Sequence, residues 1–212
     1  MKKVGVIHTT PSTVESTTRL IEENIKDVHV MNILDDTILP DMANGNNTEY
    51  VGIRWEKYAE ILIQMGADAV LSACSTVGPF VEAANKKSKI PILRIDDAMA
   101  EEAVKRGRRI TVLATFKPTL GPTTELIERK DPSAGVKTIF IENAFDLLNA
   151  GEIKKHNELI SEAVKKEIRT ADVIVLAQAS MATALSEFNE RDKAKILTSP
   201  LLGVLKLKKI LE

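Results

Sequence analysis

The chain has a single cysteine, Cys74, among its 212 residues. One thiol cannot form an internal disulfide, so the cross-linked frameworks of small secreted proteins are excluded. A zinc site built on several cysteines is excluded for the same reason. Aromatic residues make up only 4% of the chain, and no Lys/Arg run is interleaved with them. The pattern typical of a nucleic-acid-binding surface is therefore missing.

An excess of charge of either sign is also missing. Lys and Arg total 29 and Asp and Glu total 30, which leaves a formal net charge of −1. Such a balance gives no global attraction to nucleic acid or to an anionic membrane. No apolar stretch approaches the ~20 residues of a membrane span. The apolar run 4–7 is also too short for a signal-peptide core. We therefore predict a cytoplasmic protein with no nucleic-acid partner and no membrane partner.

Three familiar chemical motifs are absent as well. No glycine-rich phosphate loop follows the first predicted strand, and no Gly-x-Ser-x-Gly elbow occurs. A bound nucleotide is therefore not expected. The three histidines, His8, His29 and His156, show no metal-ligand spacing, so no metal is predicted. We interpret His29 and His156 as surface residues.

Short β-branched runs alternate along the chain with longer amphipathic runs. Strands are predicted over 3–8, 28–33, 69–73, 90–95, 109–115, 136–141, 173–177 and 196–198. Helices are predicted over 14–26, 50–65, 79–87, 98–106, 122–129, 153–170, 181–191 and 201–211. Most strand candidates are continuous apolar runs, which is typical of strands buried on both faces of a parallel sheet. The alternation predicts an α/β fold with right-handed crossovers.

The sequence also repeats itself internally. Residues 67–76 align without gaps on 171–180, residues 3–9 on 109–115, and residues 28–33 on 136–141. The three offsets are 104, 106 and 108 residues, and the matched segments follow one another in the same order in both halves. Buried strands resemble one another, so any single match could be chance. Three matches at nearly constant offset indicate two copies of one βαβ unit.

The repeat predicts two lobes with parallel sheets, related by a pseudo-twofold axis. The first lobe is expected to contain residues 1–97 together with the last helix, 200–212, and the second lobe residues 98–199. Ligands of parallel sheets bind beyond the carboxyl ends of the strands. The symmetry would bring four such ends together, so we expect the active site in the cleft between the lobes.

The residues at those four strand ends are rich in hydroxyl and amide groups. They are His8, Thr9 and Thr10; Cys74, Ser75 and Thr76; Thr115 and Thr119; and Gln178, Ala179 and Ser180. Thr9 and Thr10 are candidates for binding a carboxylate, because Ser12 and Thr13 are better placed to cap the next helix. Thr115 and Thr119 are the second-lobe counterparts, with capping as their alternative role.

Cys74 is the strongest single candidate for chemistry. It follows a buried strand, and Gly78-Pro79 begins the next helix, where proline suits the first turn. Free backbone N–H groups and the positive end of the helix dipole would favour its thiolate. The same groups would bind a carboxylate or an oxyanion. The alternative is a small buried residue without a chemical role.

His8 ends the first predicted strand and could orient or deprotonate a thiol. Its reference pKa of ~6.5 suits proton transfer near neutral pH. The alternative is a strand-end histidine that hydrogen bonds to nearby backbone.

Five segments of the chain resemble the aspartate/glutamate racemase superfamily, which includes hydantoin racemases, maleate isomerases and arylmalonate decarboxylases. They are residues 6–11, 72–79 with the Cys-Ser-Thr turn, 113–115, 176–181 and 199–204. The resemblance implies two Rossmann-like lobes, an active site between them, and chemistry without a cofactor or a metal. In typical members two cysteines face each other across the α-carbon of the substrate. The resemblance also leaves a homo-oligomer open.

The sequence departs from that family pattern at one decisive position. Cys74 matches the first cysteine, whereas Gln178 occupies the place of the second, and glutamine cannot titrate. Ser75, Ala179 and Ser180 replace the Asn and Thr-His that amino-acid racemases of the family carry. A small carboxylate or a cyclic amide therefore fits better as the substrate than an α-amino acid.

The leading hypothesis is a cofactor-independent racemase/isomerase-superfamily enzyme. Cys74 would transfer a proton, or attack covalently, next to a carboxylate or amide carbonyl of a small molecule. One active thiol also suits a decarboxylase-type reaction, and racemisation would need a second base, for which His8 is the nearby candidate. A second hypothesis is a regulatory protein that binds a small carboxylate and has lost the reaction. A third is an interaction scaffold with a fortuitous repeat.

Overall fold

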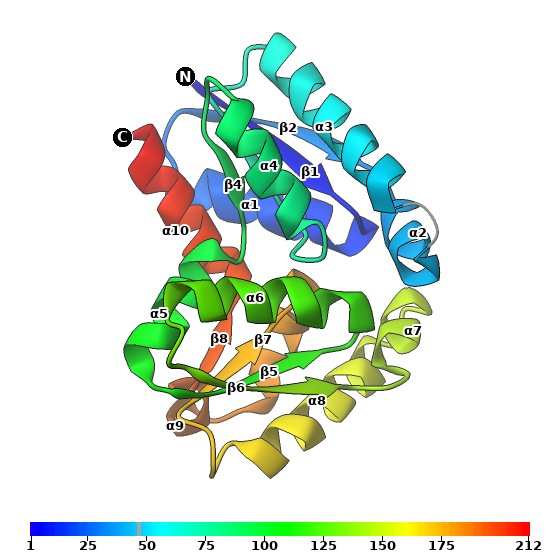
Figure 1. Ribbon diagram of the computed structural model, residues 1–212, viewed down its shortest axis with the longest axis vertical. Coiled ribbons are helices and arrows are strands. Elements are labelled where there is room, and N and C mark those ends of the chain that lie inside the picture. Colours follow the sequence, from blue (N-terminus) through cyan, green and yellow to red (C-terminus); the bar gives the residue numbers. More distant parts are fainter. Residues whose placement is uncertain (46–47) are drawn as a thin grey trace. The chain divides into compact units, whose positions relative to one another are not determined.

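Two four-stranded parallel sheets form in this computed structural model, one from each half of the internal repeat (Figure 1). The structure describes residues 1–45 and 48–212. They divide into a first unit, Met1–Ile95 with Pro200–Glu212, and a second unit, Asp96–Ser199. The strand order is β2-β1-β3-β4 in the first unit and β6-β5-β7-β8 in the second. The predicted α/β class with parallel sheets is confirmed.

The first unit alternates strands and helices along nearly its whole length. Its elements are β1 (Lys2–His8), η1 (Pro11–Thr13), α1 (Val14–Asn24), β2 (Val28–Leu34), α2 (Ile38–Asn44), α3 (Thr48–Gln64), β3 (Ala69–Ser72), α4 (Gly78–Lys87), β4 (Ile92–Arg94) and, after its first residue, α10 (Ser199–Leu211).

The second unit follows the same plan. Its elements are α5 (Asp97–Arg106), β5 (Arg109–Ala114), η2 (Lys117–Thr119), α6 (Leu120–Lys130), β6 (Gly135–Phe140), α7 (Ala144–Asn149), α8 (Ile153–Glu167), β7 (Val173–Leu176), η3 (Ala179–Glu187), α9 (Glu190–Lys193) and β8 (Ile196–Thr198). No helix in residues 1–45 and 48–212 combines the length and the apolarity needed to cross a bilayer.

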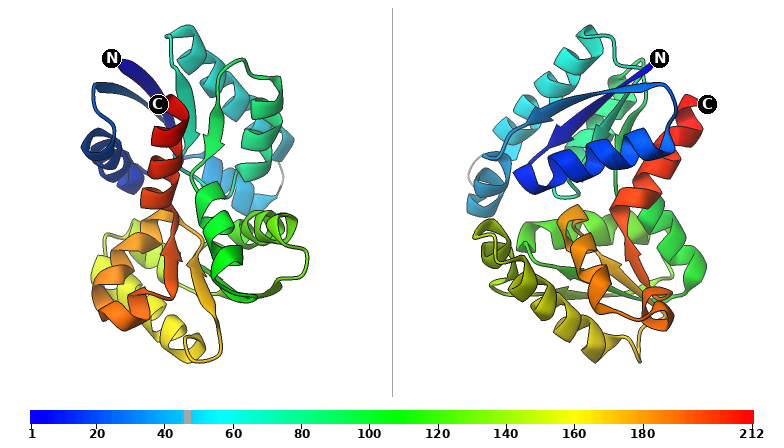
Figure 2. Two further views of the ribbon diagram at one scale, coloured as in Figure 1. Left: turned by 90° about the vertical axis from the view of Figure 1, so that its left-hand side faces the viewer. Right: turned by 180° about the vertical axis from the view of Figure 1, so that it is seen from behind.

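The first unit buries its sheet between helices on both faces. Figure 2 shows α1 lying along one face of that sheet. Val4 and Val6 of β1 share a core on that face with Ile21 of α1 and Val204 of α10. The other face of β1 approaches α3 so closely that a Cβ at Gly5 would lie 2.7 Å from a Leu62 methyl carbon. The two faces of this strand are therefore both buried, as its continuous apolar pattern predicted.

Both units repeat the same hydrogen bonds between the backbones of neighbouring elements. Ala73 N–H donates to the carbonyl of Ile7 over 2.9 Å in the first unit. Ala177 N–H donates to the carbonyl of Leu113 over the same 2.9 Å in the second. These residues lie at equivalent positions of the sequence repeat. The repeat is therefore a repeat of structure and not a chance resemblance between buried strands.

Three sequence expectations need correction. The strands β2 and β6 lie at sheet edges and alternate between half-buried and exposed residues, so they are not buried on both faces. The predicted helix 181–191 is instead the 3₁₀ helix η3 followed by the short helix α9. The side chain of Asn189 accepts a hydrogen bond from Asp192 N–H over 3.0 Å and starts α9 separately. The helices α2 and α7, of 7 and 6 residues, were not predicted.

Candidate functional site

The adjacent parallel strands β1 and β3 of the first unit end side by side, and Cys74 lies just beyond the carboxyl end of β3. Ile7 of β1 pairs with Ser72 of β3, so the residues that follow these two positions leave the sheet side by side. The Thr9 side chain, just beyond β1, hydrogen bonds to the Cys74 thiol, just beyond β3. The structure thus brings together two residues that lie 65 positions apart in the sequence.

Four hydrogen-bond donors surround the sulfur of Cys74. They are the side chains of Thr9 and Thr76 and the backbone N–H groups of Thr76 and Val77. The two backbone groups belong to the turn before α4, where the first N–H groups of a helix have no partner within the helix. Such donors stabilise a thiolate once it forms.

Burial acts in the opposite direction and outweighs these hydrogen bonds. Only 8% of Cys74 is exposed. Burial raises the pKa of the Cys74 thiol above its ordinary value, although hydrogen bonds from Thr9, Thr76 and Val77 lower it in part. The turn supplies hydrogen bonds that favour the thiolate, and burial outweighs them. At neutral pH the resting group is therefore a protonated thiol. The hydrogen-bond donors around it would stabilise the thiolate that forms when the proton leaves.

A buried arginine supports the turn that carries these donors. Only 4% of Arg94 is exposed, and its Nη1 lies 2.6 Å from Oε1 of Glu82 on α4. A Cβ on Gly78 would collide with the guanidinium of Arg94. Gly78 N–H also donates to the Ser75 carbonyl over 3.1 Å. Sequence analysis did not single out Arg94, because its role depends on β4 lying beside β3.

His8 is fully buried and has both ring nitrogens engaged. Its Nδ1 lies 2.9 Å from Oγ1 of Thr13, and its Nε2 lies 3.0 Å from Oδ1 of Asn32 on β2. Burial lowers the pKa of His8, and the hydrogen bond with Asn32 opposes that effect. A proton on Nε2 allows donation to Asn32, whereas the Thr13 hydroxyl at Nδ1 also has the Thr10 carbonyl as an acceptor for its single proton. A role for His8 as a base stays a prediction, whereas its contacts hold the end of β1 in place.

The remaining candidates of the first unit differ in their freedom to meet a ligand. Ser75 is buried, and its hydroxyl has no hydrogen-bond partner among the described residues. Thr10 is partly exposed, and its Oγ1 accepts a hydrogen bond from Ser12. Thr13 was expected to cap α1, but its side chain makes no capping bond and instead contacts His8 and the Thr10 carbonyl.

Gln178 occupies the equivalent position at the sheet edge of the second unit. Its Oε1 accepts hydrogen bonds from the backbone N–H groups of Thr115, over 2.7 Å, and Phe116, over 3.1 Å. The Thr115 hydroxyl donates to the same oxygen over 3.2 Å. The structure therefore brings Thr115 and Gln178 together, as the repeat predicted for neighbouring strand ends.

The other second-unit candidates lie close by in the chain but differ in exposure. Ala179 and Ser180 begin η3 and are partly exposed. Thr119 ends η2 and is fully buried. Side-chain contacts with a ligand are therefore easier for Ser180 than for Thr119.

His156 is a buried polar residue that sequence analysis placed wrongly at the surface. It is fully buried on α8, and its Nδ1 lies 3.0 Å from Oδ1 of Asn157. Its Nε2 has no partner among the described residues. The missed signal was helical spacing, because His156, Ile160 and Val164 lie on one face of α8 and the other two are core residues. His29, by contrast, is exposed as expected.

These two buried histidines predict an acid-sensitive fold. Burial lowers the pKa of both His8 and His156, so each binds its proton more readily in the unfolded chain. We expect the free energy of unfolding to be fully present above pH ~6.5 and to fall as the pH drops toward the lowered pKa values. Urea unfolding at a series of pH values between about 8 and 5 measures this loss. A His156→Gln variant should show a shallower loss, and an unchanged slope would contradict the assignment.

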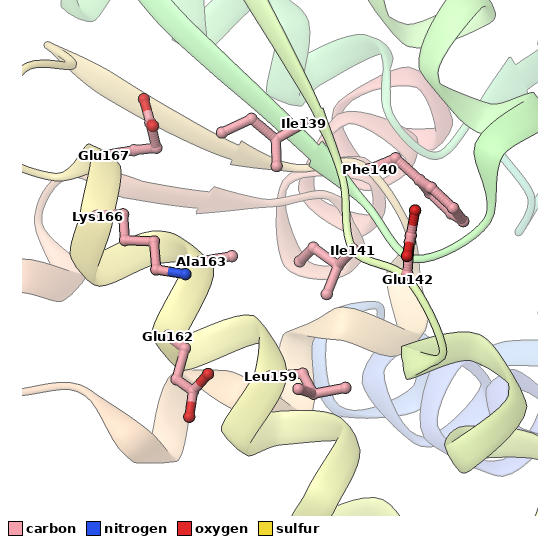
Figure 3. Close-up of a pocket in the computed structure, with 9 residues that line it drawn as sticks. All are labelled: Ile139, Phe140, Ile141, Glu142, Leu159, Glu162, Ala163, Lys166 and Glu167. Carbon is pink, nitrogen blue, oxygen red and sulfur yellow. The ribbon is translucent and has the colours of Figure 1, made fainter.

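A separate pocket of about 270 Å³ lies between β6 and α8 in the second unit (Figure 3). Ile139, Ile141, Leu159 and Ala163 give it apolar walls, and carboxylates such as Glu162 lie at its rim. It contains none of the residues singled out from the sequence. Among the described residues no group of three or more His, Cys, Asp or Glu side chains is placed to hold a metal ion.

Comparison with known families identifies one match over most of the chain. The family model described as Asp/Glu/Hydantoin racemase matches residues 4–204. A search of curated proteins finds none that matches this chain.

Solved structures of racemases share the fold at low sequence identity. A glutamate racemase isoform from Bacillus anthracis is 16% identical, with a TM-score of 0.80 over 99% of this chain and 81% of that one. The aspartate racemase of Picrophilus torridus is 18% identical, with a TM-score of 0.71 over 99% and 95%. An allantoin racemase from Klebsiella pneumoniae is 16% identical, with a TM-score of 0.73 over 100% and 88%.

Proposed function

Because this chain belongs to the Asp/Glu/Hydantoin racemase family, we propose that it is an enzyme that protonates a small substrate from one side with the thiol of Cys74. The substrate carries a carboxylate or an amide carbonyl next to the reacting carbon. One observation carries this proposal: four hydrogen-bond donors surround the sulfur of Cys74, and burial raises the pKa of its thiol.

The raised pKa of Cys74 suits an acid better than a base. A buried thiol keeps its proton at neutral pH. It can deliver that proton to the carbanion or enolate left next to the carbonyl when a C–C bond breaks, a carboxylate leaves as CO₂ and the electron pair stays on the carbon. The S–H bond breaks as the C–H bond forms, and the electron pair left on sulfur is a thiolate. Thr9, Thr76 and the N–H group of Val77 then stabilise that thiolate, and solvent returns the proton.

The second unit offers no second acid at the position equivalent to Cys74. Gln178 has no titratable proton, and its oxygen is already engaged by Thr115 and Phe116. Protonation from one side fits isomerisation or decarboxylation better than racemisation between two thiols. Thr10 and Ser75, in the same unit as Cys74, are the side chains we propose for holding the substrate, which is a small carboxylate or a cyclic amide. A working thiol also suits the cytoplasm, where thiols stay reduced.

Solvent isotope incorporation tests this function. The protein in heavy water, given small dicarboxylates, hydantoins and amino acids in turn, should place one deuterium on the α-carbon of a carboxylate or cyclic amide. The labelled product should be a single enantiomer, because one thiol delivers the deuterium to one face of the carbon. NMR and chiral chromatography of the product read both features. A racemic, doubly exchanged product would contradict one-sided protonation.

A second candidate function is binding without reaction. The observation that favours it is the replacement of a second thiol by an amide that cannot titrate. A binding protein would show a raised melting temperature with a small carboxylate and no deuterium in the recovered ligand. The same heavy-water experiment therefore separates the two functions.

A further inference from the structure

The side-chain amide of Gln178 has a fixed orientation in the structure. Two backbone N–H groups, from Thr115 and Phe116, and the Thr115 hydroxyl all point at its Oε1 over 2.7, 3.1 and 3.2 Å. Backbone N–H groups can only donate, so the atom that receives them must be the oxygen. The NH₂ group therefore has to point away from this turn.

That NH₂ group is available to a ligand. Gln178 is only partly buried, and its Nε2 makes no hydrogen bond to any described residue. The residue follows β7 directly, at the carboxyl end of the second sheet, where ligands of parallel sheets bind. A group held this way offers two N–H donors and no acceptor.

We propose that Gln178 is a specificity-determining residue that selects a hydrogen-bond acceptor, a carboxylate or carbonyl oxygen, and rejects an ammonium group in the same position. The NH₂ group of Gln178 forms a charge-assisted hydrogen bond with a carboxylate. An ammonium group in the place of that carboxylate would set its own N–H donors against those of Gln178. This inference rests on the proposed function, because it concerns the class of substrate that the enzyme is proposed to take.

Two variants separate the orientation of the amide from its mere presence. Gln178→Glu keeps an oxygen for Thr115 and Phe116 but replaces the outward NH₂ with a second oxygen. Gln178→Met keeps a similar length and removes both polar atoms. In Gln178→Met the amide hydrogens of Thr115 and Phe116 should exchange faster with solvent, and in Gln178→Glu they should stay protected. Equal protection of both amides in wild type and Gln178→Met would overturn the orientation.

Binding measured without turnover tests the selectivity. Malonate and hydantoin serve as acceptor probes and 1,3-diaminopropane as a donor probe, titrated by NMR into wild-type protein and into Cys74→Ser. In both backgrounds Gln178→Met should weaken malonate about 10- to 100-fold, the usual range for one hydrogen bond to a charged group, and neutral hydantoin about 2- to 10-fold. Gln178→Glu should weaken malonate at least as much and strengthen the diamine.

The outcomes distinguish this inference from the proposed function. Acceptor probes that bind Gln178→Met as tightly as wild type, or that do not bind wild type at all, overturn the selectivity. Gln178-dependent binding together with full turnover in Cys74→Ser supports the selectivity and removes the proposed function alone. Gln178-dependent binding together with loss of turnover in Cys74→Ser supports both.

Discussion

A Cys74→Ser variant should lose about 10²- to 10⁴-fold in turnover, the range that a positioned general acid usually contributes. Serine preserves the size of the side chain and its hydrogen bonds with Thr9 and Thr76. Its hydroxyl is a far weaker acid than a thiol, so it cannot deliver the proton at a comparable rate. Initial rates with the substrate found by isotope incorporation measure the loss.

The fold should survive this substitution, which makes the loss interpretable. The melting temperature of Cys74→Ser should stay close to that of the wild-type protein, because the change removes no buried methylene group. Ser88→Ala, at the end of α4 and away from the turn, is the control for a substitution on the same segment. Full activity in Cys74→Ser would refute the assignment of the thiol as the acid.

A Gly78→Ala variant should lose both stability and activity. The added Cβ would collide with the guanidinium of Arg94, which is buried and paired with Glu82. Overpacking of this kind typically costs about 1–3 kcal/mol of unfolding free energy. The first turn of α4 would also move relative to Cys74, and the N–H groups of Thr76 and Val77 with it. We therefore expect a decrease in kcat larger than the change in KM.

Gly121→Ala provides the matched comparison. Gly121 lies at the second position of α6, and no atom lies within 4 Å of the Cβ that alanine would add there. Alanine in a helix is favoured over glycine by roughly 0.5–1 kcal/mol, so this variant should be as stable as wild type or slightly more stable. Urea unfolding of the two variants measures the contrast. Equal stabilities would show that Arg94 moves aside without cost.

Much of the fold was predictable because its strands are strongly apolar. All eight predicted strands are present, with ends that differ by at most two residues. Long amphipathic helices such as α3 and α8 were also found from their spacing. The helices α2 and α7 were missed because a segment of 6 or 7 residues contains too few turns for a helical period to show.

The chemistry of single residues was predictable in type but not in detail. The sequence indicated that Cys74 precedes a helix and that Gln178 replaces a second thiol. It did not indicate that burial would raise the pKa of Cys74, because burial depends on everything that packs around the sulfur. The support of Gly78 by Arg94 was equally invisible, since the two residues lie on different elements.

The sequence by itself determined the α/β class, the twofold repetition of the chain and the residue types at the strand ends, because these follow from local periodicity and from identity at fixed spacing. Only the tertiary structure decided the protonation state and orientation of those residues. The contact of Thr9 with the Cys74 sulfur, and the N–H groups of Thr115 and Phe116 that hold the oxygen of Gln178, depend on strand ends that are distant in the chain and adjacent in the sheet.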